Sequence, residues 1–182
     1  MLITFFCKKE MIIENKNTLK KEKPRMIRIG KRIRLVQFDY LREEALEWYQ
    51  DPESMQDIMG KPVIYTREQI REMYLWQNKY GMLYYIEYEL QGRFQTIGDV
   101  WLAEDDYAIV IDKKYRNRHI GRIVTKYFIR KAKVMDREFI IVREIFNWNK
   151  ASQKMFENLH FYPYKELQDS WSYRRELKTT EK

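Results

Sequence analysis

The sequence predicts an α/β fold in which helices flank a central mixed sheet, mostly antiparallel, with one parallel crossover. Two patterns lead to this expectation: short runs that alternate apolar and polar side chains, as strands do, and longer stretches whose apolar residues recur at helical spacing. The length of 182 residues, with 45% hydrophobic and 34% charged side chains, fits a single core and excludes wholesale disorder.

The first half of the chain is expected to begin with a strand and two helices. Residues 32–39 alternate as a strand does, and Asp39 can cap a helix that extends to about residue 49. An Asp-Pro step ends that helix. Thr66, with Gln69 three residues later, resembles a capping box and predicts the start of the second helix.

The second half is expected to be mainly sheet. Residues 82–90 and 94–103 form a predicted hairpin, and a buried strand follows at 107–112. Apolar residues between Ile120 and Met135 then repeat at helical spacing, which makes the connection to the next strand a parallel crossover. The remaining predicted elements are a strand, a helix and two strands, at 138–146, 149–159, 162–168 and 171–177.

The domain is expected to span residues 26–182. Residues 1–25 mix short apolar runs with Lys and Glu, and we expect them to be poorly ordered or an N-terminal extension. The single cysteine, Cys7, excludes an internal disulfide, and with two histidines the chain offers no expected metal site. No apolar run has membrane-spanning length and no secretory signal is recognisable, so the expected location is the cytoplasm.

Positive charge is concentrated in one segment. The net charge is +8, of which residues 1–25 contribute +4 and residues 113–133 contribute +9 without a single acid, so the remainder carries −5. Such a segment attracts anions. Nucleic acid, a membrane surface and a small polyphosphate ligand all remain open on composition alone.

The start of the predicted helix after residue 112 has the features of a phosphate site. A helix N-terminus presents free N–H groups and the positive end of the helix dipole. Gly121 lets a diphosphate approach the backbone, and Arg116, Arg118 and Arg122 can donate charge-assisted hydrogen bonds to it. The alternative is a basic, solvated helix face, which is the expected role of the basic residues further along the helix.

Two sequence blocks resemble motifs of the GNAT superfamily of acetyl-CoA-dependent N-acetyltransferases. Residues 116–121, Arg-Asn-Arg-His-Ile-Gly, are similar to the R/Q-x-x-G-x-G/A loop of that family. Residues 149–161 are similar to its N-x-x-S/A-x-x-x-Y-x-x-x-G-F block. The two blocks lie in the family's order, and the elements expected between residues 32 and 177 fit its fold.

The resemblance implies a GNAT fold, whose two central parallel strands splay apart, and direct transfer of an acetyl group from acetyl-CoA to a primary amine of a small molecule or peptide. The loop and the helix would hold the diphosphate of coenzyme A (CoA), while the preceding strand and an asparagine would bind its pantetheine arm. The residues implied to bind the co-substrate are Ile109, Val110, Ile111, Arg116, Asn117, Arg118, His119, Ile120, Gly121, Arg122 and Asn149. A homodimer is possible, and neither nucleic acid nor a membrane is expected as a partner.

Three residues depart from the family pattern. His119 replaces the first glycine of the loop, and His160 replaces the glycine before the final phenylalanine. Phe156 stands where many members have the tyrosine that protonates the departing thiolate. Ser152 or water is then the candidate acid, or the thiolate leaves without one.

Glu144 is the candidate general base, because the resemblance places it where some members keep a catalytic glutamate, and we expect it to be partly buried. The alternative is a solvent-facing carboxylate paired with a neighbour. Asp99 and Glu104 are weaker candidates that would act through a water molecule. A backbone N–H near Val110 or Ile111 would stabilise the oxyanion.

Two other functions remain open at this stage. One is a nucleic-acid-binding module that uses the basic helix, which would show steep salt dependence. The other is a chain of the same fold that binds CoA without catalysis, as Phe156 would allow. The identity of the amine acceptor and the oligomeric state have no readable signal in the sequence.

Overall fold

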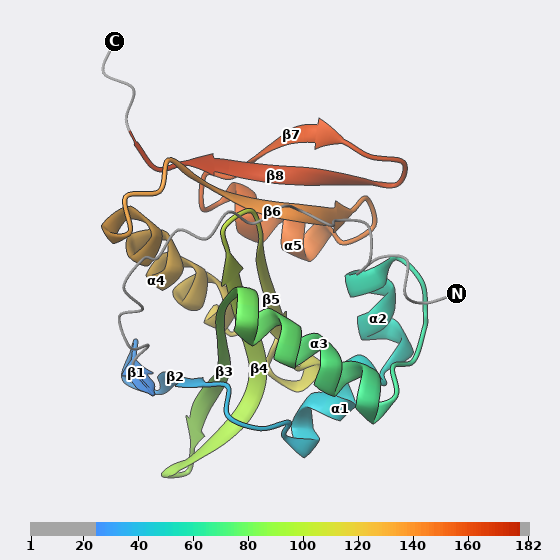
Figure 1. Cartoon of the computed structure of the whole chain (residues 1–182), viewed down its shortest axis with the longest axis vertical. Coiled ribbons are helices and arrows are strands. Elements are labelled where there is room, and N and C mark those ends of the chain that lie inside the picture. Colours follow the sequence, from blue (N-terminus) through green and yellow to red (C-terminus); the bar gives the residue numbers. More distant parts are fainter. Residues whose placement is uncertain (1–24, 179–182) are drawn as a thin grey trace.

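The computed structural model describes residues 25–178, so the expectation for residues 1–24 lies outside the described part of the chain. Within it the architecture is α/β, as predicted, and is built from two sheets and five α-helices (Figure 1). No helix among the described residues is both long and apolar enough to cross a membrane.

The first sheet has five strands in the order β1-β2-β3-β4-β5, and every neighbouring pair is antiparallel. The hairpin between β3 and β4 turns through Gln91 and Gly92, both at positive φ, as a tight two-residue turn of type I′ requires. The strands are β1 (Met26–Arg28), β2 (Ile33–Gln37), β3 (Gly81–Leu90), β4 (Arg93–Ala103) and β5 (Tyr107–Ile111).

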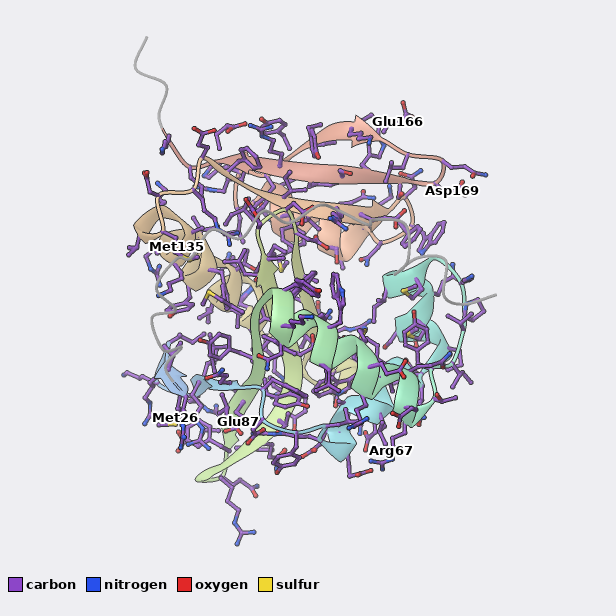
Figure 2. The ribbon with its side chains drawn as sticks, viewed as in Figure 1. Met26, Arg67, Glu87, Met135, Glu166 and Asp169 are labelled. Atoms are coloured by element: carbon purple, nitrogen blue, oxygen red, sulfur yellow. The ribbon has the colours of Figure 1, made fainter. Side chains whose placement is uncertain are left out.

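The second sheet has three antiparallel strands in the order β6-β8-β7. It lies across one end of the first sheet in Figure 1, and Figure 2 labels Glu166 and Asp169 at the hairpin between β7 and β8. The strands are β6 (Phe139–Phe146), β7 (Tyr162–Glu166) and β8 (Ser170–Glu176).

The two sheets meet where β5 approaches β6, but no ladder joins these strands in the part of the chain that the structure describes. Asp106, just before β5, accepts a hydrogen bond from the backbone N–H of Arg143 on β6 (3.1 Å) and ties the strands together near this end. The separation beyond it is the splay that the sequence resemblance predicts. The expected crossover over the basic helix therefore joins two neighbouring strands that do not pair.

The helices cover both faces of the first sheet. They are α1 (Glu43–Tyr49), α2 (Pro52–Met59), α3 (Arg67–Tyr80), α4 (Ile120–Val134) and α5 (Lys150–Glu157), with a 3-10 turn, η1 (Lys113–Tyr115), after β5. Side chains alternate along β3: Leu83 and Tyr85 pack with α1 and α3, whereas Tyr84 and Ile86 pack with α4 and the second sheet. The sheet thus separates two apolar cores, with α1–α3 and α4 on different sides of it (Figure 1).

Most predicted elements are confirmed, and the structure differs from the prediction mainly in the N-terminal part of the domain, up to α2. The capping box of α3 is present, since Thr66 and Gln69 exchange both hydrogen bonds. The predicted cap at Asp39 is wrong: α1 starts at Glu43, because the chain stays extended while the N–H of Arg42 donates to the hydroxyl of Tyr85 (3.2 Å). Strand β1 and helix α2 were not expected from the sequence.

Candidate functional site

Strand β5 pairs with β4 along one edge and turns its other edge toward the splay. The N–H of Asp112 donates to the carbonyl of Ile97 at 2.8 Å, which fixes the alternation along the ladder. Val110 therefore directs its N–H and C=O toward β4, whereas those of Ile109 and Ile111 point away. Of Val110 and Ile111, the two positions expected to supply the oxyanion donor, Ile111 directs its N–H away from β4, and Ile109 does the same. Neither N–H faces an acceptor on β4.

The loop before α4 has the backbone shape that a glycine-containing loop would have. Asn117 and His119 adopt left-handed conformations, with φ of 62° and 61°. His119 stands where the motif that this loop resembles has its first glycine, and it adopts a left-handed conformation of the kind that glycine favours, although a side chain there costs roughly 1 kcal/mol. Its imidazole is exposed.

Free backbone donors mark the start of α4. The N–H groups of Ile120, Gly121 and Arg122 have no hydrogen-bond acceptor among residues 25–178, and no side chain caps the helix. The positive end of the helix dipole coincides with these donors. Together they form a place where a phosphate group can bind.

Gly121 lies against the side chain of Met155 on α5. A Cβ atom at this position would lie 2.9 Å from the sulfur of Met155, so that flexible side chain would have to shift to admit it. The close approach of the two helices thus favours a small residue here independently of a ligand.

Three basic side chains of the predicted loop are bound to the N-terminal helices. Lys113 pairs with Asp51 (2.8 Å) and Lys114 pairs with Glu47 (3.0 Å). The hydrogen bond of Lys113, together with that of Ser54, lowers the pKa of Asp51 to about 2. These two lysines therefore fasten the loop to α1 and α2.

Arg116 is held in the same way. Its guanidinium group donates to the carbonyl of Ile111 (3.2 Å) and to the hydroxyl of Ser54 (3.1 Å), and it lies 3.5 Å from a carboxylate oxygen of Asp57. Arg118 and Arg122, in contrast, are exposed and form no ion pair within the described region. The arginines that remain free for an anion are therefore Arg118 and Arg122.

Helix α2 is the part of this site that sequence reasoning missed. Asp51 accepts from the N–H of Ser54 (3.0 Å) as the N-cap, Pro52 is the first helical residue, and Gly60 ends the helix at a φ of 71°. A capping Asp, a following Pro and a Gly eight residues later together form a helix signal. Read separately, the same residues indicate breaks.

Glu144 lies in an irregular part of β6, where the pairing with β8 shifts between Val142 and Ile145. The carboxylate is exposed and accepts a hydrogen bond from the hydroxyl of Ser170 (2.6 Å). The partial burial expected for it is wrong, because the shifted pairing turns this residue outward. It matches the alternative considered from the sequence, a solvent-facing carboxylate paired with a neighbour.

Helix α5 begins shortly after β6, with Asn149 as its N-cap. Asn149 caps the helix by accepting from the N–H of Ser152 (3.1 Å), and the NH₂ group of its amide has no acceptor within residues 25–178. The hydroxyl of Ser152 has no partner among the described residues. Phe156 is buried against Tyr107 and Phe161, with ring centroids 6.1 and 5.1 Å apart, so it belongs to the core.

Asp99 is a buried carboxyl group on β4, beside Val110 of β5. The hydroxyls of Tyr49 (3.0 Å) and Tyr74 (2.6 Å) both donate to it from α1 and α3. Burial raises its pKa to about 6, although these hydrogen bonds oppose the shift. Glu104, the other weaker candidate base, is exposed in the turn before β5.

Comparison with known proteins finds similar structures but no similar sequence. No family model and no curated protein matches the sequence. Among solved structures, a GNAT-family acetyltransferase from Bacillus anthracis is 18% identical with a TM-score of 0.65, and the match covers 81% of this chain and 96% of that one.

Two further structures match over a similar length. Spermidine N-acetyltransferase from Vibrio cholerae, in complex with CoA and spermine, is 13% identical, with a TM-score of 0.65 and coverage of 81% of this chain and 97% of that one. An acetyltransferase from Salmonella typhimurium that modifies the N-terminal serine of ribosomal protein L7/L12 is 14% identical, with a TM-score of 0.62 and coverage of 84% and 99%. At these identities the likeness establishes the fold: the chain has the fold of GNAT acetyltransferases.

Proposed function

We propose that the chain is an N-acetyltransferase that moves an acetyl group from acetyl-CoA directly to a primary amine. The observation that carries the proposal is the meeting of two sets of free backbone donors. One set is the edge of β5 that faces the splay, and the other is the first turn of α4. The structural neighbours named above, which include an enzyme in complex with CoA and spermine, support the same reaction class.

The residues present fit acetyl-CoA, which supplies an activated acetyl group as a thioester. The N–H groups of Ile120, Gly121 and Arg122 suit its diphosphate. Arg118 adds a guanidinium group that lies over the ring of Tyr115 (5.5 Å) and has no ion pair among the described residues. Arg116 orders the loop through α2 instead of binding the phosphate directly.

Along β5, the backbone of Ile109 offers both an N–H and a C=O to the pantetheine amides, as a neighbouring strand would. The N–H of Ile111 is left to stabilise the charge that develops on the thioester oxygen. The carbonyl of Ile111 accepts from Arg116, and this contact fixes the end of the strand. The free amide NH₂ of Asn149 supports the pantetheine arm from the opposite side of the splay.

The amine must lose a proton before it attacks the thioester carbon. We assign this step to Glu144, which is accessible to solvent and can pass the proton on. No protein nucleophile takes part, so the acetyl group passes from sulfur to nitrogen in one transfer. Phe156 has no group that can donate a proton, and we propose that the thiolate is protonated by the hydroxyl of Ser152 or by water.

The class of amine acceptor is inferred from the charge of the chain. Outside the two basic segments the chain carries a net charge of −5, which favours a cationic amine on a small molecule or a peptide. A broad amine screen that measures release of free CoA tests the activity. We expect turnover on at least one amine and a loss of about tenfold or more in kcat for Glu144→Gln.

Binding of acetyl-CoA and of RNA is measured beside the screen, and two outcomes oppose the proposal. Saturable binding of acetyl-CoA without turnover on any amine identifies a chain that binds CoA without catalysis. Absence of acetyl-CoA binding, together with RNA affinity that falls steeply with salt, identifies a nucleic-acid-binding module. A Glu144→Gln variant with unchanged kcat leaves the reaction class intact and removes Glu144 from the role of base.

A further inference from the structure

A cationic groove lies beside the middle of α4. It is a hollow of about 320 Å³ between α4, the turn after α5 and strand β8. No acidic residue lines it, and its basic side chains are Lys126, Arg130, Lys133, His160 and Arg175. We use the name cationic groove for these five residues.

The basic residues that α4 contributes to the cationic groove have no carboxylate partners among the described residues. Lys126, Arg130 and Lys133 form no ion pair with any residue between 25 and 178, whereas Lys113 and Lys114 of the nearby loop are both paired. Several like charges around one hollow repel one another and attract an anion. The volume of the hollow lies at the lower end of the range for small-ligand sites.

Arg175 is held in place on the floor of the groove. Its guanidinium group donates to the carbonyl of Leu159, in the turn after α5. Burial lowers the pKa of Arg175. This fixed cation does not depend on the flexible lysine side chains, and it gives the groove a defined position relative to the helices.

The groove continues the diphosphate site along one face of α4. Arg122, Lys126, Arg130 and Lys133 follow one another at steps of four, four and three residues, which places them in one stripe. Side chains on a helix tilt toward its N-terminus, so the lysine and arginine groups lean toward the free N–H groups of the first turn. In Figure 2 the other end of the helix is marked by Met135, the residue that follows it.

CoA carries phosphate groups with a spacing that suits the first turn of α4 and the cationic groove. CoA has a diphosphate and, one ribose away, a separate 3′-phosphate. Along the helix axis Lys126 lies about 7.5 Å and Arg130 about 13.5 Å beyond Gly121, and their long side chains reach back over part of that distance. Resting on the function proposed above, we propose that the cationic groove binds the 3′-phosphate of CoA and thereby distinguishes CoA from dephospho-CoA.

Titration calorimetry on the full chain with CoA and with dephospho-CoA tests this inference. The wild type should bind CoA roughly tenfold or more tightly than dephospho-CoA, as expected for contacts between a phosphate and two charged donors. In the double variant Lys126→Gln/Arg130→Gln the two affinities should differ by less than about threefold, with that for dephospho-CoA unchanged. Lys131→Gln is the matched control, because Lys131 is a basic residue of α4 that does not line the groove.

The outcomes separate this inference from the proposed function. Equal affinity of the wild type for both compounds overturns the inference and leaves the acetyltransferase proposal standing. Loss of the preference in Lys131→Gln as well overturns it, because a general charge effect would then explain the data. Equal affinities combined with RNA binding that the double variant abolishes assign the groove to nucleic acid. Absence of saturable binding to either compound overturns the proposed function and the inference with it.

Discussion

Two arginines only two positions apart in the phosphate loop have different tasks. Arg118 is exposed and free of ion pairs within the described chain, whereas Arg116 contacts Ile111, Ser54 and Asp57. We therefore expect Arg118→Ala to weaken CoA binding about tenfold with little change in stability. Arg116→Ala should instead lower the free energy of unfolding by about 1–2 kcal/mol, because it removes the hydrogen bonds to Ile111 and Ser54 and leaves the half-buried carboxylate of Asp57 without its cation.

Calorimetry with CoA and urea denaturation of both variants distinguish these roles. Lys131→Ala serves as the control for loss of a positive charge from the same region, since Lys131 has no ion pair among the described residues. A large loss of CoA affinity in Arg116→Ala at unchanged stability would show that the bonds to α2 give way to the ligand.

The buried carboxyl of Asp99 should make the stability of the chain depend on pH. Burial raises its pKa from 3.8 to about 6. The native state therefore keeps a proton that the unfolded chain releases, so the stabilisation is fully present below about pH 4 and is lost as the pH rises through about 6. We expect Asp99→Asn to remove this slope, which is at most roughly 1.4 kcal/mol per pH unit.

Urea denaturation between pH 4 and pH 8 measures this slope. Burial also raises the pKa of Asp106 to about 6, so a second slope in the same window should remain in Asp99→Asn. Asp106→Asn is the matched variant, and it should retain the part of the pH dependence of stability that is due to Asp99. Identical pH profiles for the wild type and Asp99→Asn would contradict the expectation.

At the scale of elements, the contact between α4 and α5 decides how the phosphate loop is placed. A methyl group at Gly121 would meet the sulfur of Met155 at 2.9 Å, so the side chain of Met155 must shift, and this cost opposes the roughly 1 kcal/mol by which Ala is favoured over Gly in a helix. We therefore expect Gly121→Ala to change the free energy of unfolding by less than about 1 kcal/mol. Met155→Ala makes room for the methyl group. In that background Gly121→Ala should become more stabilising, and a double-mutant cycle by thermal or urea denaturation measures the difference. Additive effects would show that the two helices adjust without strain.

The regular elements could be predicted because their signals are local. The apolar period of α4, the capping box of α3 and the turn between β3 and β4 each lie within a few residues of one another. Helix α2 has eight residues and begins with an Asp-Pro step that reads equally well as a break. Its stability comes in part from packing, since Ser54 and Met55 are buried, and such packing leaves no periodic pattern in so short a segment.

The candidate site could be predicted only in part, for the same reason. The position of the loop follows from the motif, whereas the left-handed conformation of His119 was not predicted from the sequence. The partners of Arg116 do not follow from the motif either, because Asp57 and Ser54 are 59 and 62 positions away in the sequence. The outward turn of Glu144 depends on a register shift between β6 and β8, which side-chain identity does not reveal.

At the scale of the whole molecule, α2 closes one side of the splay between the two sheets. The ring of Phe146 at the end of β6 lies so close to Gly60 that a Cβ atom there would be 2.5 Å from it. The indole N–H of Trp148 donates to the carbonyl of Gln56 (3.3 Å). These contacts link the second sheet to α2, and the bonds of Arg116 link the loop after β5 to the same helix, while no ladder joins β5 and β6 among residues 25–178.

A splay held open in this way leaves backbone donors on β5 for a ligand, and amide hydrogen exchange can detect them. The N–H groups of Ile109 and Ile111 face the splay and should exchange quickly in the free protein, whereas that of Val110 is bonded to β4 and should be protected. Added acetyl-CoA, which carries the thioester oxygen, should slow exchange at Ile109 and Ile111 and leave Val110 unchanged, because only the first two gain an acceptor. Protection of all three before acetyl-CoA is added would mean that β5 and β6 pair in solution and that the splay is closed. Equal slowing at Val110 would instead indicate general stiffening of the sheet, so the difference between neighbouring amides is what locates the ligand on this edge.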